Sequence, residues 1–405
     1  MAVLVTHPGR QHSHQAALAL FAEGLLAGYW CGAPALEAQG GRLLASLLRR
    51  FHTYSPVPLP RSLVRWRPTT PGARRIGWGL LPHGGGAWVD YAASREFDGW
   101  VARRWRSVEP TAVLCCEISA LSTFRAARRA GRVCLLDAPS LHHTAQDRLH
   151  GTTDPPALHR RIVATKDAEI ALAHHVLTVS PIARETYLEA GTPEDRVHSV
   201  LLGADLELFA PPAAARPKTG EFRFVFAGAR LYRKGFDLLV EAMSKVHARY
   251  PEARLLAVGP AGDAEGALPT GHPAIERLAP RTQVELARLF GTCHCLVLPS
   301  RNDSYGMVVA EALATGLPAV VSDMVGSKVL VQPGTTGWII PVEDQAALTE
   351  RLLACVEERE KLIGMGAACR AAAATATWDK YRQRFAHLVA DLIGASALRS
   401  ESTAR

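Results

Sequence analysis

Two series of short apolar runs, each alternating with segments of helical character, constrain the fold of this chain more than any other feature. In such an alternation each apolar run is a buried strand, and each intervening segment is a helix that crosses back over the sheet. The second series begins at Phe222, after the stretch 210–220, which is rich in Pro and Ala, has no apolar period and is typical of a linker. The sequence therefore predicts an α/β protein of two doubly wound, Rossmann-like domains.

The expected strands and helices set the domain boundaries. The strands of the first series are expected at 3–6, 111–117, 132–137, 175–179 and 196–202, with a helix over 13–27 that ends at Gly28. The strands of the second series are expected at 222–227, 254–258, 275–278, 294–298 and 318–322. The resulting parts are an N-terminal domain over 1–209, a linker over 210–221, a C-terminal domain over 222–375, a helix over 376–395 that can pack back on the N-terminal domain, and a frayed tail over 396–405. Within the first domain, 42–110 lacks a clean period and is expected to be irregular.

The bulk composition is that of a globular protein. The chain has 405 residues, of which 48% are hydrophobic, and this length favours two domains over one. It contains no uncharged apolar run near the roughly 18 residues of a membrane-spanning helix, and its first residues lack the basic and apolar regions of a signal peptide. The eight cysteines form no CxxC pair. We therefore expect a cytoplasmic protein whose cysteines are reduced and pack as small hydrophobes.

Positive charge is concentrated near the N-terminus. The chain has a formal net charge of +8, and no acidic residue occurs between Glu37 and Asp90. This basic interval carries eight arginines: Arg42, Arg49, Arg50, Arg61, Arg65, Arg67, Arg74 and Arg75. Such a field favours anionic partners, including the lipid head groups of the inner membrane face, where the protein could bind peripherally. The alternative is a solvated basic face, because arginine is the usual cation throughout this chain.

The segment 296–322 carries the most informative chemistry. A buried strand ends at Pro299, a polar loop carries Asp303, and Gly306 allows the backbone to approach a ligand at the start of a helix. That helix is apolar nearly all round, which is typical of a buried helix, and Glu311 is its only charge. A carboxylate there needs hydrogen-bond donors or a polar cleft, and sugar hydroxyls are good donors. The alternative interpretation is that Glu311 faces water on a narrow exposed strip.

A basic turn follows the first strand of the second series. The strand ends at Gly228, and Arg230, Arg233 and Lys234 lie between it and Gly235, which opens a helix. The turn therefore places cations at the carboxyl end of a strand, where they can neutralise a diphosphate and the charge that develops on a departing nucleotide.

Together these two segments resemble glycosyltransferase family 4, a retaining family, also called glycosyltransferase group 1, with the GT-B fold. The family's Glu-x7-Glu motif is matched by Asp303-x7-Glu311, and its G-x-P turn by 316–318. Its basic pair resembles Arg230 and Lys234. Further similarity is carried by Gly203-Ala204-Asp205 with Phe209, and by the helix and strand over 166–180 with Glu169. The resemblance covers nearly all of the C-terminal domain and the later part of the N-terminal domain, but residues 30–110 only loosely.

The resemblance implies a role for each matched residue. Glu311 would accept hydrogen bonds from the ribose of a nucleotide diphosphate-sugar, and Asp303 would contact the transferred sugar. Arg230 and Lys234 would hold the diphosphate, and Gly9 lies in an N-terminal loop near the donor–acceptor cleft. Backbone N–H groups near the sugar and phosphate would come from Ser304, Tyr305, Gly306 and Met307. The family often places a histidine of the N-terminal domain beside the reacting centre; His143 or His142 matches it best, and His12 and His14 match it less well.

The implied activity is transfer of a sugar, with retention at the anomeric carbon, to a glycan, a lipid-linked molecule or a small molecule, as in polysaccharide biosynthesis. No Asp-x-Asp triplet occurs in the sequence, which favours a metal-independent enzyme in which the cationic turn neutralises charge. No separate cofactor and no nucleic acid partner are expected, since the nucleotide-sugar is a substrate.

Two departures from the family pattern bear on activity. Asp303 is one methylene shorter than the family's glutamate, so its carboxylate reaches roughly 1.5 Å less far. Arg230 lies one position closer to Lys234 than the commonest family spacing, so Arg233 could take its role.

Three other functions compete with the transferase interpretation. A nicotinamide-dependent oxidoreductase would carry G-x-G-x-x-G after its first strand, and this sequence has no such pattern. A sugar-nucleotide epimerase-like GT-B enzyme would share the donor site but not the stereochemical outcome. A non-catalytic GT-B subunit is suggested by Asp303 at the first acidic position.

Overall fold

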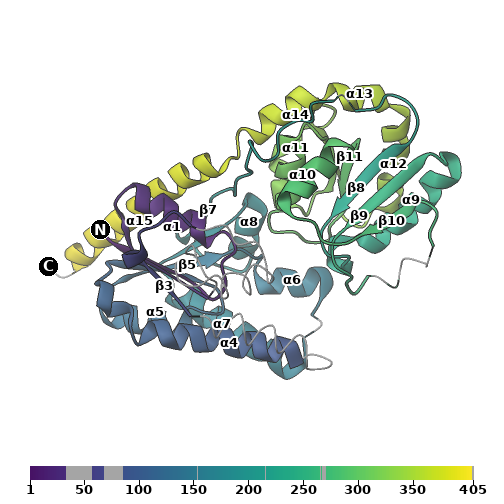
Figure 1. Ribbon diagram of the computed structural model, residues 1–405. Helices are drawn as coiled ribbons and strands as arrows, with labels where there is room; N and C mark the ends of the chain where they lie inside the picture. Colours follow the sequence, from purple (N-terminus) through teal and green to yellow (C-terminus); the bar gives the residue numbers. More distant parts are fainter. Residues whose placement is uncertain are drawn as a thin grey trace, which may run out of the picture.

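The computed structural model describes residues 1–32, 57–67, 85–152, 154–214, 216–264, 266 and 271–403. Figure 1 shows two lobes, each built on a sheet covered by helices; the first half of the chain forms one lobe and most of the second half forms the other. The predicted α/β class and the division into two Rossmann-like domains are confirmed. The basic interval lies largely outside the described residues, which include only Arg61, Arg65 and Arg67 of its eight arginines.

The N-terminal domain has a parallel sheet of seven described strands in the order β3-β2-β1-β4-β5-β6-β7. The strands are β1 (Val3–His7), β2 (Leu26–Cys31), β3 (Val64–Trp66), β4 (Ala112–Cys116), β5 (Val133–Ala138), β6 (His175–Thr178) and β7 (Val197–Ser199). The helices are α1 (Ser13–Ala22), α4 (Gly85–Ala102), α5 (Leu121–Arg129), α6 (His143–His150), α7 (Pro156–Leu172) and α8 (Pro181–Glu189). The strand order reverses between β1 and β4, so the loops after these strands border a crevice.

The C-terminal domain repeats the plan with six parallel strands in the order β10-β9-β8-β11-β12-β13. The strands are β8 (Phe222–Ala227), β9 (Ala253–Val258), β10 (Ile275–Leu278), β11 (Cys295–Leu298), β12 (Ala319–Ser322) and β13 (Gly337–Ile340). The helices are α9 (Phe236–Arg249), α10 (Gln283–Gly291), α11 (Met307–Ala314), α12 (Gln345–Glu357), α13 (Arg359–Gly364) and α14 (Gly366–Ala373). The order reverses between β8 and β11, so the basic turn after β8 and the Asp303 loop after β11 are neighbours.

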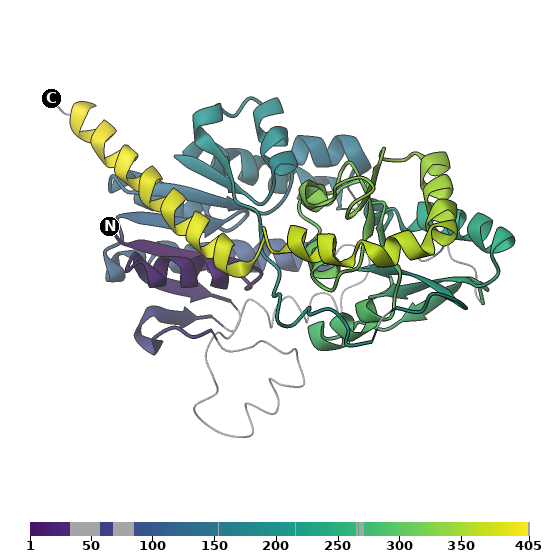
Figure 2. The ribbon, with the colours of Figure 1, turned by 90° about the horizontal axis from the view of Figure 1, so that it is seen from above.

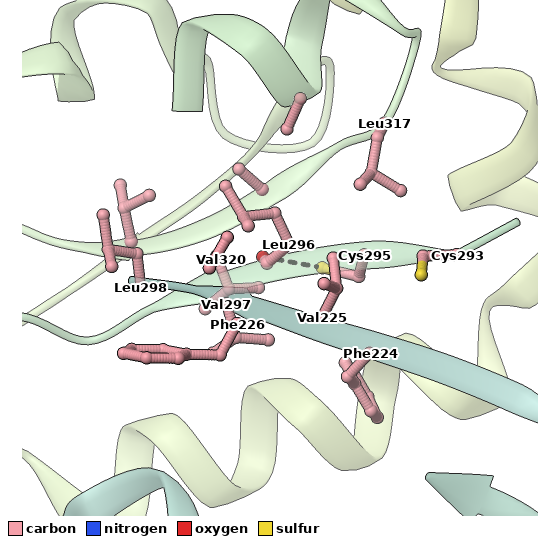
Figure 3. Close-up of a cluster of buried hydrophobic side chains, with 14 of the residues drawn as sticks. Phe224, Val225, Phe226, Cys293, Cys295, Leu296, Val297, Leu298, Leu317 and Val320 are labelled. Carbon is pink, nitrogen blue, oxygen red and sulfur yellow. Dashed lines mark hydrogen bonds between the residues drawn. The ribbon is translucent and has the colours of Figure 1, made fainter. Parts of the chain in front are cut away.

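The core of the C-terminal domain fixes β8 and β11 side by side. Figure 3 shows Phe224 and Phe226 of β8 beside Leu296 and Leu298 of β11, and all four side chains are fully buried. The Sγ atom of Cys295 donates to the carbonyl of Leu296 at 3.3 Å, the dashed line in that view. None of the eight cysteines forms a disulfide, and all are buried. Burial of these apolar side chains holds the two loops that follow the strands in a fixed relation.

The last helix joins the two domains. Figure 2 shows α15 (Trp378–Thr403), in yellow, leaving the C-terminal domain and lying along the N-terminal one. Its Tyr381, Phe385 and Val389 share a buried cluster with residues of β1 and α1. The Nη1 atom of Arg382 donates to Gln15 of α1 at 2.6 Å. The end of the C-terminal half is thereby fastened to the N-terminal domain.

Three expectations about secondary structure were wrong. The first helix ends at Ala22 and not at residue 27, because Gly24 in a left-handed conformation (φ 66°) breaks it before β2 begins. The interval 42–110 is not irregular throughout: α4 forms over its later part, with Phe97 and Val101 buried on one face. The expected tail at 396–405 is helical as far as Thr403, since residues after Gly394 contain no Gly or Pro and include good helix formers.

One buried carboxylate organises the loop after β4. The carboxylate of Glu169, on α7, is fully buried and accepts hydrogen bonds from the backbone N–H groups of Ile118 (2.6 Å), Ala120 (2.8 Å) and Leu121 (3.0 Å). This contact fixes the loop that follows a strand at the crevice.

We expect Glu169→Ala to lower the free energy of unfolding by about 3 kcal/mol or more, because it leaves three buried N–H donors without an acceptor. Urea unfolding measures the loss. The matched control is Glu189→Ala, whose side chain is 50% exposed and whose removal should change stability by about 0.5 kcal/mol or less. Equal effects of the two substitutions would contradict the assigned role of Glu169.

Candidate active site

A cleft with a volume of about 970 Å³ lies between the two domains. Its N-terminal wall is formed by the ends of β1, β4 and β5 together with α4, α6 and α7. Its C-terminal wall is formed by the turn after β8 and the loop after β11, and includes Arg233, Asn302, Asp303 and Ser304. Both walls therefore stand at the carboxyl ends of parallel strands, where ligands bind in such folds.

Two of the residues singled out in the sequence meet at the C-terminal wall, where Asp303 lines the cleft and Lys234 lies behind the lining. The ammonium of Lys234 forms an ion pair with the carboxylate of Asp303, and both side chains are largely buried. Arg233 donates to the carbonyl of Asn302 at 3.4 Å and lines the cleft directly. The neighbouring positions of β8 and β11 account for this meeting of residues that lie 69 positions apart in the sequence.

The loop from Asp303 to Gly306 is held in place by its backbone. The N–H of Asp303 donates to Met324 O at 3.0 Å, and the N–H of Gly326 donates to Asp303 O at 2.9 Å. Gly306 has φ 80°, and a side chain there would bring Cβ to 2.8 Å from Val325. A residue other than glycine would both strain the backbone and clash, which explains the glycine at the start of α11.

Glu311 lies on the second turn of α11 and is only 6% exposed. It is not part of the cleft lining, and its side chain makes no hydrogen bond or ion pair with the part of the chain that the structure describes. Burial alone raises the pKa of the Glu311 carboxyl to about 7. The water-facing alternative for Glu311 is therefore wrong, and the residue is a buried acid whose ionised form is poorly stabilised.

Four other predicted residues lie at the margin of the cleft or behind it. Arg230 is buried and donates to Gly259 O at 2.7 Å. Tyr305 is buried and donates to Leu202 O in the N-terminal domain, so only its backbone can serve a ligand in this state. Met307 packs against the cluster shared with α15, and Gly9 donates to His7 Nδ1 at 2.8 Å. None of these four lines the cleft, although the neighbours Pro8, Gln11 and Ser304 do.

His143 lies at the start of α6 and lines the cleft. Its Nε2 atom is 3.1 Å from a carboxylate oxygen of Asp167, and its ring lies 4.1 Å from that of His142. Burial is the main cause that lowers the pKa of His143. The weaker candidates lie elsewhere: His12 pairs with Asp137 at 3.1 Å, His14 contacts Gln11 O at 2.9 Å, and neither lines the cleft.

A set of polar residues in the N-terminal wall was not singled out as a site from the sequence. Lys166 of α7 pairs with Glu117, which follows β4, at 3.0 Å, and both line the cleft. His150, at the end of α6, accepts a hydrogen bond from the side-chain amide of Asn302 at 3.0 Å and so connects the two walls. The position of Glu117 directly after a buried strand is a signal that could have identified it.

A second contact between the domains involves a backbone carbonyl. The hydroxyl of Ser180, which caps α8, donates to Ser304 O at 2.5 Å. A Cβ on Gly326 would lie 2.1 Å from the same carbonyl oxygen and 2.6 Å from Ser180 Oγ. The two domains therefore approach closely at the Asp303 loop.

Within the described residues, His142, His143 and Asp167 are the one set of three side chains close enough to share a metal ion, with ligand atoms within 4.8 Å of one another. His142 Nδ1 already contacts Thr144 Oγ1 at 2.8 Å. The predicted independence from metal stays a prediction. No helix in the described part of the chain has the length and apolar character needed to cross a bilayer.

Two parallel-sheet Rossmann-like domains that face each other across a polar cleft define the GT-B fold of glycosyltransferases, and the solved structures agree. The structure has a TM-score of 0.72 with sucrose-phosphate synthase from Thermosynechococcus elongatus, at 18% identity, covering 98% of this chain and all of that one. It has a TM-score of 0.65 with Anabaena HepE solved in complex with UDP, at 16% identity, covering 96% of this chain and all of that one. At these identities the likeness establishes the fold alone.

The sequence comparisons find similarity to known glycosyltransferases. Residues 221–358 match the family described as glycosyl transferases group 1. A D-inositol 3-phosphate glycosyltransferase from Catenulispora acidiphila is 30% identical over 247 residues, which is 56% of this chain and 58% of that protein. A protein of the same name from Corynebacterium aurimucosum is 29% identical over 289 residues, 64% of this chain and 67% of that one. These matches agree with the resemblance to family 4, and the alignments span just over half the length of the first curated relatives.

Proposed function

We propose that the protein is a retaining, metal-independent glycosyltransferase that moves a sugar from a nucleotide diphosphate-sugar to a hydroxyl group of an acceptor. One observation carries the proposal: Lys234 and Arg233 of the turn after β8 lie beside the loop after β11 at the switch point of the C-terminal sheet. Lys234 pairs with Asp303 of that loop, and Arg233 and Asp303 line the interdomain cleft. A nucleotide diphosphate-sugar is a ligand with complementary groups, since its diphosphate needs cations and its hydroxyls need acceptors.

The donor is proposed to bind along the C-terminal wall. Lys234 and Arg233 would hold the diphosphate, with Arg230 behind them, and Asp303 would accept hydrogen bonds from the sugar. Because Lys234 is paired with Asp303 in this structure, an arriving diphosphate would compete with that carboxylate for the ammonium. Glu311 would accept hydrogen bonds from the ribose. The HepE structures with UDP and with UDP-glucose, which share this fold, support such a donor class.

The reaction is proposed to run on one face of the donor sugar. The bond between the anomeric carbon and the diphosphate oxygen breaks, and the acceptor oxygen bonds to the same face of that carbon. The acceptor proton passes to the departing phosphate, whose charge the cationic turn stabilises. His143 stands in the opposite wall, with its low pKa keeping the ring neutral near pH 7, so that it could accept a hydrogen bond from a sugar or acceptor hydroxyl.

A donor screen tests the proposal. The purified chain is incubated with uridine, guanosine and adenosine diphosphate-sugars, and release of the nucleoside diphosphate is measured with and without acceptors. We expect slow release from one donor, accelerated by an acceptor, and a product in which NMR finds the anomeric configuration of the donor. Inversion or epimerised donor would favour the epimerase-like alternative, and binding without release would favour a non-catalytic subunit.

We also propose that the basic interval contacts anionic lipid. Of its described arginines, Arg67 pairs with Glu96 and Arg65 lies over the ring of Trp30 at 4.8 Å, so the remaining arginines would carry most of the attraction. Vesicles with 30% anionic lipid should sediment the protein at low salt, and binding should fall steeply as the screening length drops from about 30 Å at 0.01 M salt to about 8 Å at 0.15 M. Binding that is absent or insensitive to salt would remove this proposal.

A further inference from the structure

The N-terminal wall of the cleft, which faces the proposed donor, has a distinctive charge pattern. Among the described residues that line it, the carboxylates of Glu117, Asp147 and Asp154 stand against a single ammonium, that of Lys166. Asp90 also lines this wall. An acceptor bound against this wall would contact these charged side chains.

The ammonium of Lys166 is already in an ion pair. Lys166 is 8% exposed and pairs with Glu117 at 3.0 Å, so these two charges neutralise each other within the wall. Separating a largely buried ion pair to free the lysine for another anion is strongly unfavourable, because Glu117 would be left buried and uncompensated. Lys166 is therefore poorly suited to bind a phosphate group of an acceptor.

Two of the four histidines that line this wall, His143 and His150, add little positive charge. Burial lowers the pKa of both His143 and His150, and for His150 the nearby Arg233 contributes as well. His150 Nε2 also accepts a hydrogen bond from the side-chain amide of Asn302, which requires that nitrogen to be unprotonated. Both rings are uncharged near neutral pH.

Two carboxylates remain after this pairing. Asp147 contacts His159 Nε2 at 3.0 Å and keeps an exposed side chain. Asp154 is half-buried at the start of α7, and its carboxylate forms no ion pair with the residues that the structure describes. Neutral hydrogen-bonding groups complete the lining, among them Tyr91, Ser140, Gln146 and Thr152. The described wall is thus suited to hydroxyl groups and is negative on balance.

We infer that the acceptor is a polyhydroxylated molecule that carries no phosphate or carboxylate, and that an amino group on it improves binding. This inference rests on the proposed function, since it names the acceptor class of the same cleft. The inferred acceptor class differs from the phosphorylated cyclitol, inositol 3-phosphate, that the names of the curated relatives contain.

Matched acceptors test the inference in the full chain with the donor found in the screen. One triad is glucosamine, glucose and glucose 6-phosphate; the other is an aminocyclitol, myo-inositol and inositol 3-phosphate. We expect kcat/KM to follow the order amine, neutral, phosphate in at least one triad, with about a tenfold difference between the ends. Preference for the phosphate, equal rates across each triad, or no acceleration by any member would overturn the acceptor class.

Variants at Asp154 test whether this wall causes the preference for amine over phosphate acceptors. Asp154→Lys should shift the ratio of amine to phosphate kcat/KM by about tenfold toward phosphate, and Asp154→Asn by a smaller factor. The matched control is Glu241→Gln, an exposed carboxylate of α9 outside the cleft lining, which should leave the ratio unchanged. A ratio that does not respond to Asp154→Lys contradicts the inference.

The two proposals fail in different ways. Slow release of nucleoside diphosphate without an acceptor depends on the donor site alone. If no donor is consumed or bound, the proposed function is wrong and the acceptor class falls with it. If donor is consumed and phosphorylated acceptors are preferred, only the acceptor class is wrong.

Discussion

Glu311→Gln is expected to reduce turnover by at least about a hundredfold while leaving the fold intact. The amide has nearly the same shape as the carboxylate, so packing on α11 is preserved. It replaces one acceptor oxygen with a donor and removes the charge, so two ribose hydroxyls could no longer both donate to it. Steady-state rates with the donor from the screen measure the loss, and circular dichroism checks the fold.

The same substitution should raise stability above neutral pH. The pKa of Glu311 is raised from its ordinary value of 4.5 to about 7 in the folded chain. The folded state therefore binds a proton more tightly than the unfolded state, and stability falls as pH rises from about 4.5 to about 7. The full cost, roughly 3 kcal/mol as an upper bound, is present above pH 7 and is absent in Glu311→Gln.

Melting temperatures at pH 5 and pH 8 separate the variant from the native chain. The stability advantage of the variant over the native chain should be small at pH 5 and should reach its full size at pH 8. Glu350→Gln, on the surface of α12, is a control that should show no such difference. Normal turnover in Glu311→Gln would remove the residue from the donor site, whatever the melting temperatures.

Most of the fold could be predicted from the sequence because its signals are local. Strands β8 and β11 are recognisable in the sequence as apolar runs. Gly235 and Gly306 mark the starts of the helices that follow, and both adopt the left-handed backbone conformation that favours glycine. Parallel strands joined by right-handed crossovers all end at the same edge of the sheet, so the loops that follow them lie along that edge. Local sequence signals are therefore enough to place the basic turn and the Asp303 loop at the same edge of one sheet.

Contacts between the domains could not be predicted in this way. The approach of His150 to Asn302, and of Tyr305 to Leu202, depends on how two independently folded units dock, and no local pattern encodes that relation. The pairing of Lys166 with Glu117 also joins residues of different elements and gave no sequence signal beyond a charge after a strand. The charge of Arg230 suggests a diphosphate ligand, yet tertiary structure turns its guanidinium to Gly259 O.

Lys234→Met is expected to lower kcat/KM for the donor by about a hundredfold to a thousandfold, because it removes a cation that would neutralise the departing diphosphate. The methionine keeps the length and the apolar stem of the side chain. The matched control is Lys245→Met on α9, which loses only an exposed pair with Glu241. Nucleoside diphosphate affinity, measured by calorimetry, should fall for Lys234→Met and not for the control.

A second substitution separates catalysis from stability at this position. Lys234→Met leaves the largely buried Asp303 without its partner, so it should also lower the free energy of unfolding by roughly 3 kcal/mol. Adding Asp303→Asn removes the uncompensated charge and should restore most of that stability. It should not restore turnover, because neither the cation for the diphosphate nor the carboxylate for the sugar is present. If the double variant regained activity along with stability, the ion pair would be a structural element of the cleft wall and the donor would have to bind elsewhere.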